Sequence, residues 1–133
     1  FMPVTSSTPL VAGPLATAAL ATTASTAPIY RWADSGKTVH ATKGETFKVR
    51  LRVCSDCGDS LRFTHRPDSA DVKLVRATKR STAKPPAVGG EEIETWTYQA
   101  VGDGTTRIAL AEHSAEKGGK VVKRFSLNVR VTG

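Results

Sequence analysis

The sequence GETFKVRLRVCSDCGDSLRF, residues 44–63, carries the clearest structural pattern of the chain. In its first half apolar and basic residues alternate one by one, which places them on opposite faces of a β-strand. The apolar face would hold Phe47, Val49, Leu51 and Val53, and the basic face Lys48, Arg50 and Arg52. Two cysteines and a glycine interrupt the alternation, and Leu61 and Phe63 resume it. The stretch therefore predicts two strands joined by a tight loop.

Short alternating segments recur on both sides of this stretch, with turn residues about every ten positions. The further strands are expected over residues 29–32, 38–41, 71–76, 93–100, 106–112 and 121–131. A long connection is expected over 78–90, because its Pro-Pro and Gly-Gly pairs disfavour a central strand. Since no helical period is visible, the pattern predicts an all-β, immunoglobulin-like antiparallel β-sandwich of seven to eight strands. Its core would contain Phe47, Val49, Leu51, Phe63, Trp96, Tyr98, Ile108, Leu110, Phe125, Leu127 and Val129.

The chain divides into a polar lead-in and one domain. Residues 1–27 are rich in Thr, Ala, Ser and Pro, and no charged residue precedes Arg31. Such a segment buries too little apolar area to offset its chain entropy, so a largely disordered linker or tail is expected. An alternative is that the leucines of this segment dock on the domain. The folded domain itself is expected over residues 28–133. A Thr/Ala/Pro-rich lead-in is also common in secreted bacterial proteins, and a secreted location is therefore expected.

The net charge of +7 comes from 19 basic against 12 acidic residues. A positive surface keeps a secreted domain soluble, and it also attracts acidic partners. The basic rows on residues 48–52 and 76–84 are interpreted as solvated, with steering of an acidic protein as the alternative. Basic residues are not interleaved with aromatic ones, so nucleic acid is not expected as a partner. No segment is apolar over the length that is needed to span a bilayer, so no membrane span is expected. The protein is expected to be a monomer.

Cys54 and Cys57 are the two cysteines of the chain. In a secreted sandwich a short disulfide that stiffens the loop is favoured. A redox pair would need a helix after the first cysteine, and no helical signal follows Gly58. A zinc site would need ligands such as His40, His65 and His113, which lie on separate segments. No metal or cofactor is therefore expected.

The polar cluster Glu112, His113, Ser114 and Glu116 contains the residue types of a hydrolase site. A serine nucleophile needs a base oriented by a third group, and neighbours on one strand point to opposite faces. These residues are therefore interpreted as solvated loop positions. We expect a protein that is not an enzyme.

The order of these features resembles the chagasin-like inhibitors of papain-type cysteine proteases, which are immunoglobulin-like sandwiches that present three loops. Gly44-Glu45 begins the strand that precedes the family's first loop. The family's Asn-Pro-Thr-Thr-Gly-Phe/Tyr motif is replaced here by 54–59, in which Gly58 is retained. Val88-Gly89-Gly90 lies at the glycine-rich second loop. Residues 114–116 replace the third loop's Arg-Pro-Trp, so the resemblance covers the strand spacing and not the motifs.

The resemblance implies a protease inhibitor whose three adjacent loops block an active-site cleft. The expected partner is then a protein, with a protease as the favoured class. The alternative is a non-inhibitory adhesion or recognition module on the same fold. In either case the partner-binding loops would contain Cys54, Ser55, Asp56, Cys57, Gly58, Asp59, Val88, Gly89, Gly90, His113, Ser114, Ala115, Glu116 and Lys117.

Overall fold

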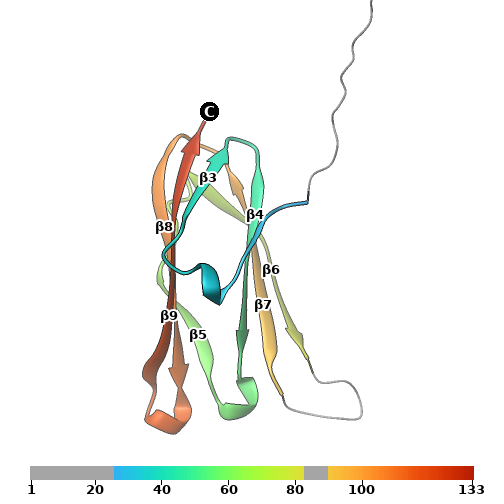
Figure 1. Cartoon of the computed structure of the whole chain (residues 1–133), viewed down its shortest axis with the longest axis vertical. Helices are drawn as coiled ribbons and strands as arrows, with labels where there is room; N and C mark the ends of the chain where they lie inside the picture. The colour runs from blue at the N-terminus through green and yellow to red at the C-terminus, as the bar shows by residue number, and fades with distance from the viewer. Residues whose placement is uncertain (1–25, 83–89) are drawn as a thin grey trace, which may run out of the picture.

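The computed structural model describes residues 26–82 and 90–133, which form a two-layered β-sandwich (Figure 1). One four-stranded sheet has the order β2-β4-β7-β6, and the other has the order β3-β9-β8-β5. The expected all-β, immunoglobulin-like fold is confirmed. The strands are β2 (Ile29–Tyr30), β3 (Thr38–Thr42), β4 (Thr46–Val53), β5 (Ser60–His65), β6 (Val72–Ser81), β7 (Glu92–Ala100), β8 (Gly104–Ser114) and β9 (Lys120–Thr132). Residues 1–25 of the expected linker lie outside the described part.

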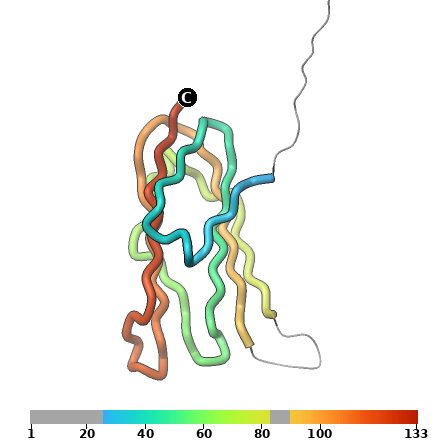
Figure 2. Tube along the Cα trace, viewed as in Figure 1, coloured from blue at the N-terminus to red at the C-terminus, as the bar shows by residue number. Residues whose placement is uncertain are grey.

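The two halves of the opening stretch belong to different sheets. β4 pairs with β2 and β7, whereas β5 pairs with β8 in the opposite layer. Two pairs, β2 with β4 and β3 with β9, are parallel, and the remaining pairs are antiparallel. This topology brings the β4–β5 and β8–β9 connections, the last residues of β6 and the first residues of β7 to one end of the sandwich, opposite the C-terminus (Figure 2).

The core lies between the two sheets and is rich in aromatic contacts. The Phe47 and Tyr98 rings stack with their centroids 5.6 Å apart, and Phe63 meets Trp96 edge-on at 5.5 Å. Such ring pairs add to the stabilisation that comes from burial alone. Every expected core residue except Phe63 is buried, and Phe63 is partly buried against the same cluster. The alternation read from β4 is confirmed, because Phe47, Val49, Leu51 and Val53 are all buried.

The first expected strand is shorter than predicted. It ends at Tyr30, and Trp32–Asp34 form a 3₁₀ turn. The Asp34 carboxylate accepts a hydrogen bond from the Arg31 backbone N–H at 2.8 Å, so a local side-chain contact competes with the strand. The indole N–H of Trp32 donates to the Arg52 carbonyl at 2.8 Å, and its ring meets Phe125 edge-on. Trp32 thus closes one side of the sandwich.

The expected connection over 78–90 is wrong at its start, because β6 continues to Ser81. Residues 78–81 pair in register with the first half of β7. β6 is an edge strand with a bulge between Leu74 and Arg76, so its side chains are mostly exposed and show no apolar alternation. Leu74 lies in register with the buried Tyr98, but it is 43% exposed because no strand covers this edge of the sheet. The Pro-Pro pair lies in 83–89, outside the described residues.

Replacing Phe125 by alanine should lower the free energy of unfolding by about 3–5 kcal/mol, because it removes a buried ring and leaves a cavity. Phe125 is 1% exposed. Urea unfolding followed by tryptophan fluorescence measures the change. The control is Val122→Ala on the same strand, where the side chain is 42% exposed and the expected loss is below about 0.5 kcal/mol. Equal losses in the two variants would contradict the assigned core.

Candidate functional site

Three loops meet at one end of the sandwich, and we call this end the loop tip. The first loop covers residues 54–59, the second 82–91 and the third 115–119. The Asp56 backbone N–H donates to the Gly90 carbonyl at 3.1 Å, and the Ser55 hydroxyl donates to the same oxygen at 3.3 Å. On the other side, the position that a Cβ would take at Gly58 is 3.0 Å from the Ala115 Cβ. The first loop therefore lies between the other two and contacts both.

The first loop is closed on itself. Cys54 and Cys57 form a disulfide, as expected from the sequence. The backbone N–H groups of Cys57 and Asp59 both donate to the Cys54 carbonyl, at 3.2 and 3.1 Å. Ser55–Cys57 form a 3₁₀ turn that ends at Gly58 in the left-handed region, with φ of 80°. Because only glycine adopts this angle without strain, the residue retained from the family motif has a geometric role here.

The described part of the second loop is its neck. The Thr82 N–H and hydroxyl both donate to the Glu91 carbonyl, at 2.8 and 3.0 Å. Gly90 is exposed and lies against the first loop. Val88 and Gly89, the other expected binding residues of this loop, lie outside the described residues.

The third loop is a single 3₁₀ turn, Ala115–Lys117, that ends at Gly118 in the left-handed region. The Gly119 N–H donates to the Ser114 carbonyl at 2.8 Å, and one ring nitrogen of His113 lies 2.9 Å from the Gly119 carbonyl. The side chains of Ala115, Glu116 and Lys117 are exposed. They are available to a partner, whereas His113 is half-buried.

The interpretation of Glu112 and Ser114 as solvated loop positions is wrong. Both lie in β8, and they are 7% and 4% exposed. The reason is that β8 continues past the last apolar residue, so polar side chains extend the inner face toward the loop tip. Ser114 is thus placed beneath the third loop, away from its exposed surface.

Glu112 and Asp59 form a carboxyl pair beneath the loop tip. Burial and the neighbouring Asp59 raise the pKa of Glu112 to about 7, with Glu91 acting in the same direction and Lys123 opposing it. Asp59 Oδ1 is buried and accepts no hydrogen bond from other described groups. A protonated Glu112 carboxyl is a donor that can hydrogen-bond to the Asp59 carboxylate, and this interaction contributes to the raised pKa of Glu112. The pair therefore holds the end of the first loop against β8 when it shares a proton.

The chemistry of the loop tip is suited to binding. Its exposed side chains include one aspartate, one glutamate and one lysine: Asp56, Glu116 and Lys117. Among the described residues no group of three or more His, Cys, Asp or Glu side chains is arranged to hold a metal ion. The first and third loops instead offer short backbone turns to a partner, and the disulfide and the hydrogen bonds to Gly90 hold the first of these turns in place. Pre-ordered loops of this kind lower the entropic cost of forming a complex.

Comparison with known proteins supports the fold. No protein-family model matches the sequence, and no curated protein matches it significantly. The structure is similar to the crystal structure of the cysteine protease inhibitor EhICP2 from Entamoeba histolytica, with a TM-score of 0.65 and 20% identity over 79% of this chain and 95% of that one. It is also similar to the solution structure of Amebosin, with a TM-score of 0.62 and 14% identity over 81% and 100%.

The expected resemblance to chagasin-like cysteine protease inhibitors is thus confirmed as a shared immunoglobulin-like sandwich. Within 26–82 and 90–133, no helix has the length and apolar character needed to cross a membrane.

Unfolding free energy should fall as the pH rises from about 5 to 8. Glu112 binds its proton more tightly in the fold, at a pKa of about 7, than at the usual 4.5, so deprotonation costs stability on the order of 2 kcal/mol across this window. Glu112→Gln keeps a donor beside Asp59 and should remove most of the decline. A smaller decline should remain, because burial also raises the pKa of Glu94.

Urea unfolding at pH 5 and pH 8 measures this effect. Glu116→Gln, which neutralises an exposed carboxylate of the third loop, is the control and should keep the wild-type decline. An unchanged decline in Glu112→Gln would show that the carboxyl pair does not share a proton.

Proposed function

We propose that this protein is a secreted protease inhibitor that enters an active-site cleft with the loop tip. The observation that carries the proposal is the contact of the first loop with both neighbours, through Gly90 on one side and Ala115 on the other. A wedge whose first and third loops are pre-ordered fits a concave cleft without needing a catalytic group of its own. The similarity in fold to EhICP2, a cysteine protease inhibitor, makes papain-type cysteine proteases the first class to test.

The contact surface proposed for the inhibitor consists of the exposed positions of the loops. Asp56, Cys57 and Gly58 come from the first loop, and Ala115, Glu116 and Lys117 come from the third. This surface is small and charged, so its target would carry complementary charge at the rim of the cleft. The disulfide is consistent with an oxidising, extracellular location, and the inhibitor would act as a monomer.

A second candidate function is a recognition module that binds a protein without inhibiting it. The absence of the Asn-Pro-Thr-Thr and Arg-Pro-Trp motifs from positions 54–59 and 114–116 favours this candidate. Both functions use the same loops, and inhibition assays separate them.

The purified protein should inhibit at least one papain-type cysteine protease in a panel that also contains serine and metalloproteases. The double variant Cys54→Ser/Cys57→Ser should raise the inhibition constant about tenfold, because the opened loop must be ordered on binding. Circular dichroism checks that the double variant keeps the sandwich. If none of the proteases in the panel is inhibited, the inhibitor function is excluded and the recognition module is the function that is left.

Gly58→Ala should weaken inhibition, because the added methyl group would displace the third loop or the first. The new Cβ would lie 3.0 Å from the Ala115 Cβ, in addition to the strain of a φ of 80°. Gly36→Ala is a matched control, because Gly36 has a φ of 93° and no heavy atom within 4 Å of the added Cβ.

Both variants should lose about 1 kcal/mol of stability, and only Gly58→Ala should raise the inhibition constant. An equal rise in both, or in neither, would argue against the first loop as part of the contact surface.

A further inference from the structure

The outer face of the β2-β4-β7-β6 sheet is a second surface with a distinct chemistry. The strand register places side chains of β4, β7 and β6 in rows on this face: Arg52, Ile93 and Arg80; Arg50, Thr95 and Thr78; Lys48, Thr97 and Arg76. Two columns of basic side chains thus flank a central column of mainly threonines. Neighbouring strands are about 4.8 Å apart, so the two basic columns are separated by about 10 Å. We call this surface the arginine face.

The acidic residues of β7 do not belong to the arginine face. Glu92 and Glu94 are in register with Val53 and Leu51, which are buried, so these carboxylates lie on the inner side of the sheet. Glu91 borders the face at the loop-tip end, where it pairs with Arg52 at 3.2 Å. Within β2, β4, β6 and β7 as described, the face therefore combines several cations with no carboxylate of its own.

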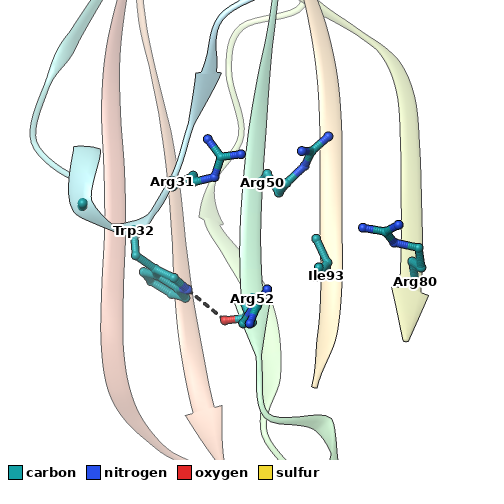
Figure 3. A pocket seen from close by; sticks show the side chains of 7 residues that line it. Arg31, Trp32, Arg50, Arg52, Arg80 and Ile93 are labelled. Atoms are coloured by element: carbon teal, nitrogen blue, oxygen red, sulfur yellow. Dashed lines mark hydrogen bonds between the residues drawn. The ribbon is translucent and has the colours of Figure 1, made fainter. Parts of the chain in front are cut away.

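The arginine face is hollowed where the 3₁₀ turn 32–34 approaches β4 (Figure 3). Arg31, Arg50, Arg52 and Arg80 line a hollow of about 450 Å³, together with Trp32, Ala33 and Ile93. An adjoining hollow of about 400 Å³ is lined by Arg50, Arg80, Ile93 and the two threonines Thr78 and Thr95. In Figure 3 guanidinium groups from three separate segments surround this region.

The protein itself neutralises little of this charge. Arg50 donates through Nε to the Thr95 hydroxyl at 3.2 Å, which orients the guanidinium group and leaves its charge unpaired. Among the ion pairs of the described residues, the one that involves this face is Arg52 with Glu91. Gathering like charges costs free energy, and an anion in the hollow would offset that cost. Guanidinium groups are suited to this because they bind oxyanions with two parallel hydrogen bonds.

We propose that the arginine face binds a linear sulfated polysaccharide that lies along β7 between the two basic columns. Sulfate groups would contact the arginines on either side. The threonine hydroxyls of the central column would hydrogen-bond to sugar hydroxyls. The site is separate from the loop tip, and it stands whether or not the protein inhibits a protease.

Two other polyanions fit this surface less well. Single-stranded nucleic acid stacks its bases on aromatic side chains, but the Trp32 ring is engaged by Phe125 and Lys123, and its N–H by the Arg52 carbonyl. An acidic protein would need apolar anchors at the centre of the interface, and Ile93 is the one large apolar side chain in the central column. A hydroxyl-rich chain matches the threonine column better than either.

Heparin oligosaccharides are the probe, and isothermal titration at 50 and 150 mM NaCl is the measurement. The wild-type protein should bind, with affinity that decreases with salt. The triple variant Arg50→Gln/Arg76→Gln/Arg80→Gln should bind at least about tenfold more weakly at 150 mM, since each lost charged contact contributes up to about 1 kcal/mol. Arg50→Lys/Arg80→Lys keeps the charge and should show a smaller loss, because lysine cannot bind a sulfate with a planar fork.

A matched control distinguishes binding at the arginine face from nonspecific attraction of heparin to a protein with a net positive charge. Arg107→Gln/Arg124→Gln/Arg130→Gln removes the same charge from exposed positions on β8 and β9 of the other sheet. This variant should bind heparin like the wild type, and all variants should keep the wild-type circular dichroism spectrum. Equal losses in the two triple variants would overturn the site, as would tighter binding of a single-stranded oligonucleotide of equal charge.

Discussion

The burial of the β4 apolar stripe between the sheets is the constraint on which the other features depend. Phe47, Val49, Leu51 and Val53 are each at most 2% exposed. Because side chains alternate along a strand, fixing these four inward also fixes Lys48, Arg50 and Arg52 outward. The same strand leads directly into the first loop of the tip. The burial of this one apolar stripe therefore fixes the position of the core, of the arginine face and of the first loop.

The loop-tip end of the sandwich is closed by polar groups. On the inner faces Glu112 follows Leu110 along β8, and Glu94 lies opposite Leu51 on β7; burial makes both carboxyl groups harder to ionise. Such groups cost stability when charged, and Glu112 also joins β8 to the first loop through its hydrogen bond with Asp59. In the proposed inhibitor this arrangement would give the wedge a defined shape under mildly acidic conditions and a looser one at alkaline pH.

Most of the fold was predictable because burial follows a simple period. The alternation in β4, β7 and β9 identified the buried residues correctly, and the two-cysteine loop predicted its disulfide. The misplaced segments have a common cause, which is that other interactions outweighed the local pattern. At Trp32 the Asp34 side chain formed a turn, and at 78–81 pairing with β7 extended an edge strand that has no apolar stripe. The polarity of Glu112 and Ser114 conceals their position on the inner face, because polar residues next to a turn are typical of an exposed loop.

The amino-acid pattern by itself determined the fold class, the core and the approximate position of each loop, because these depend on periodicity and turn residues along the chain. Tertiary structure decided which loops touch, which carboxylates pair, and which basic side chains share a face. Those relations join residues far apart in sequence, such as Asp56 with Gly90, Asp59 with Glu112, and Arg50 with Arg80. They arise only when strand register and sheet packing fix distances in three dimensions, and no period along one strand contains that information.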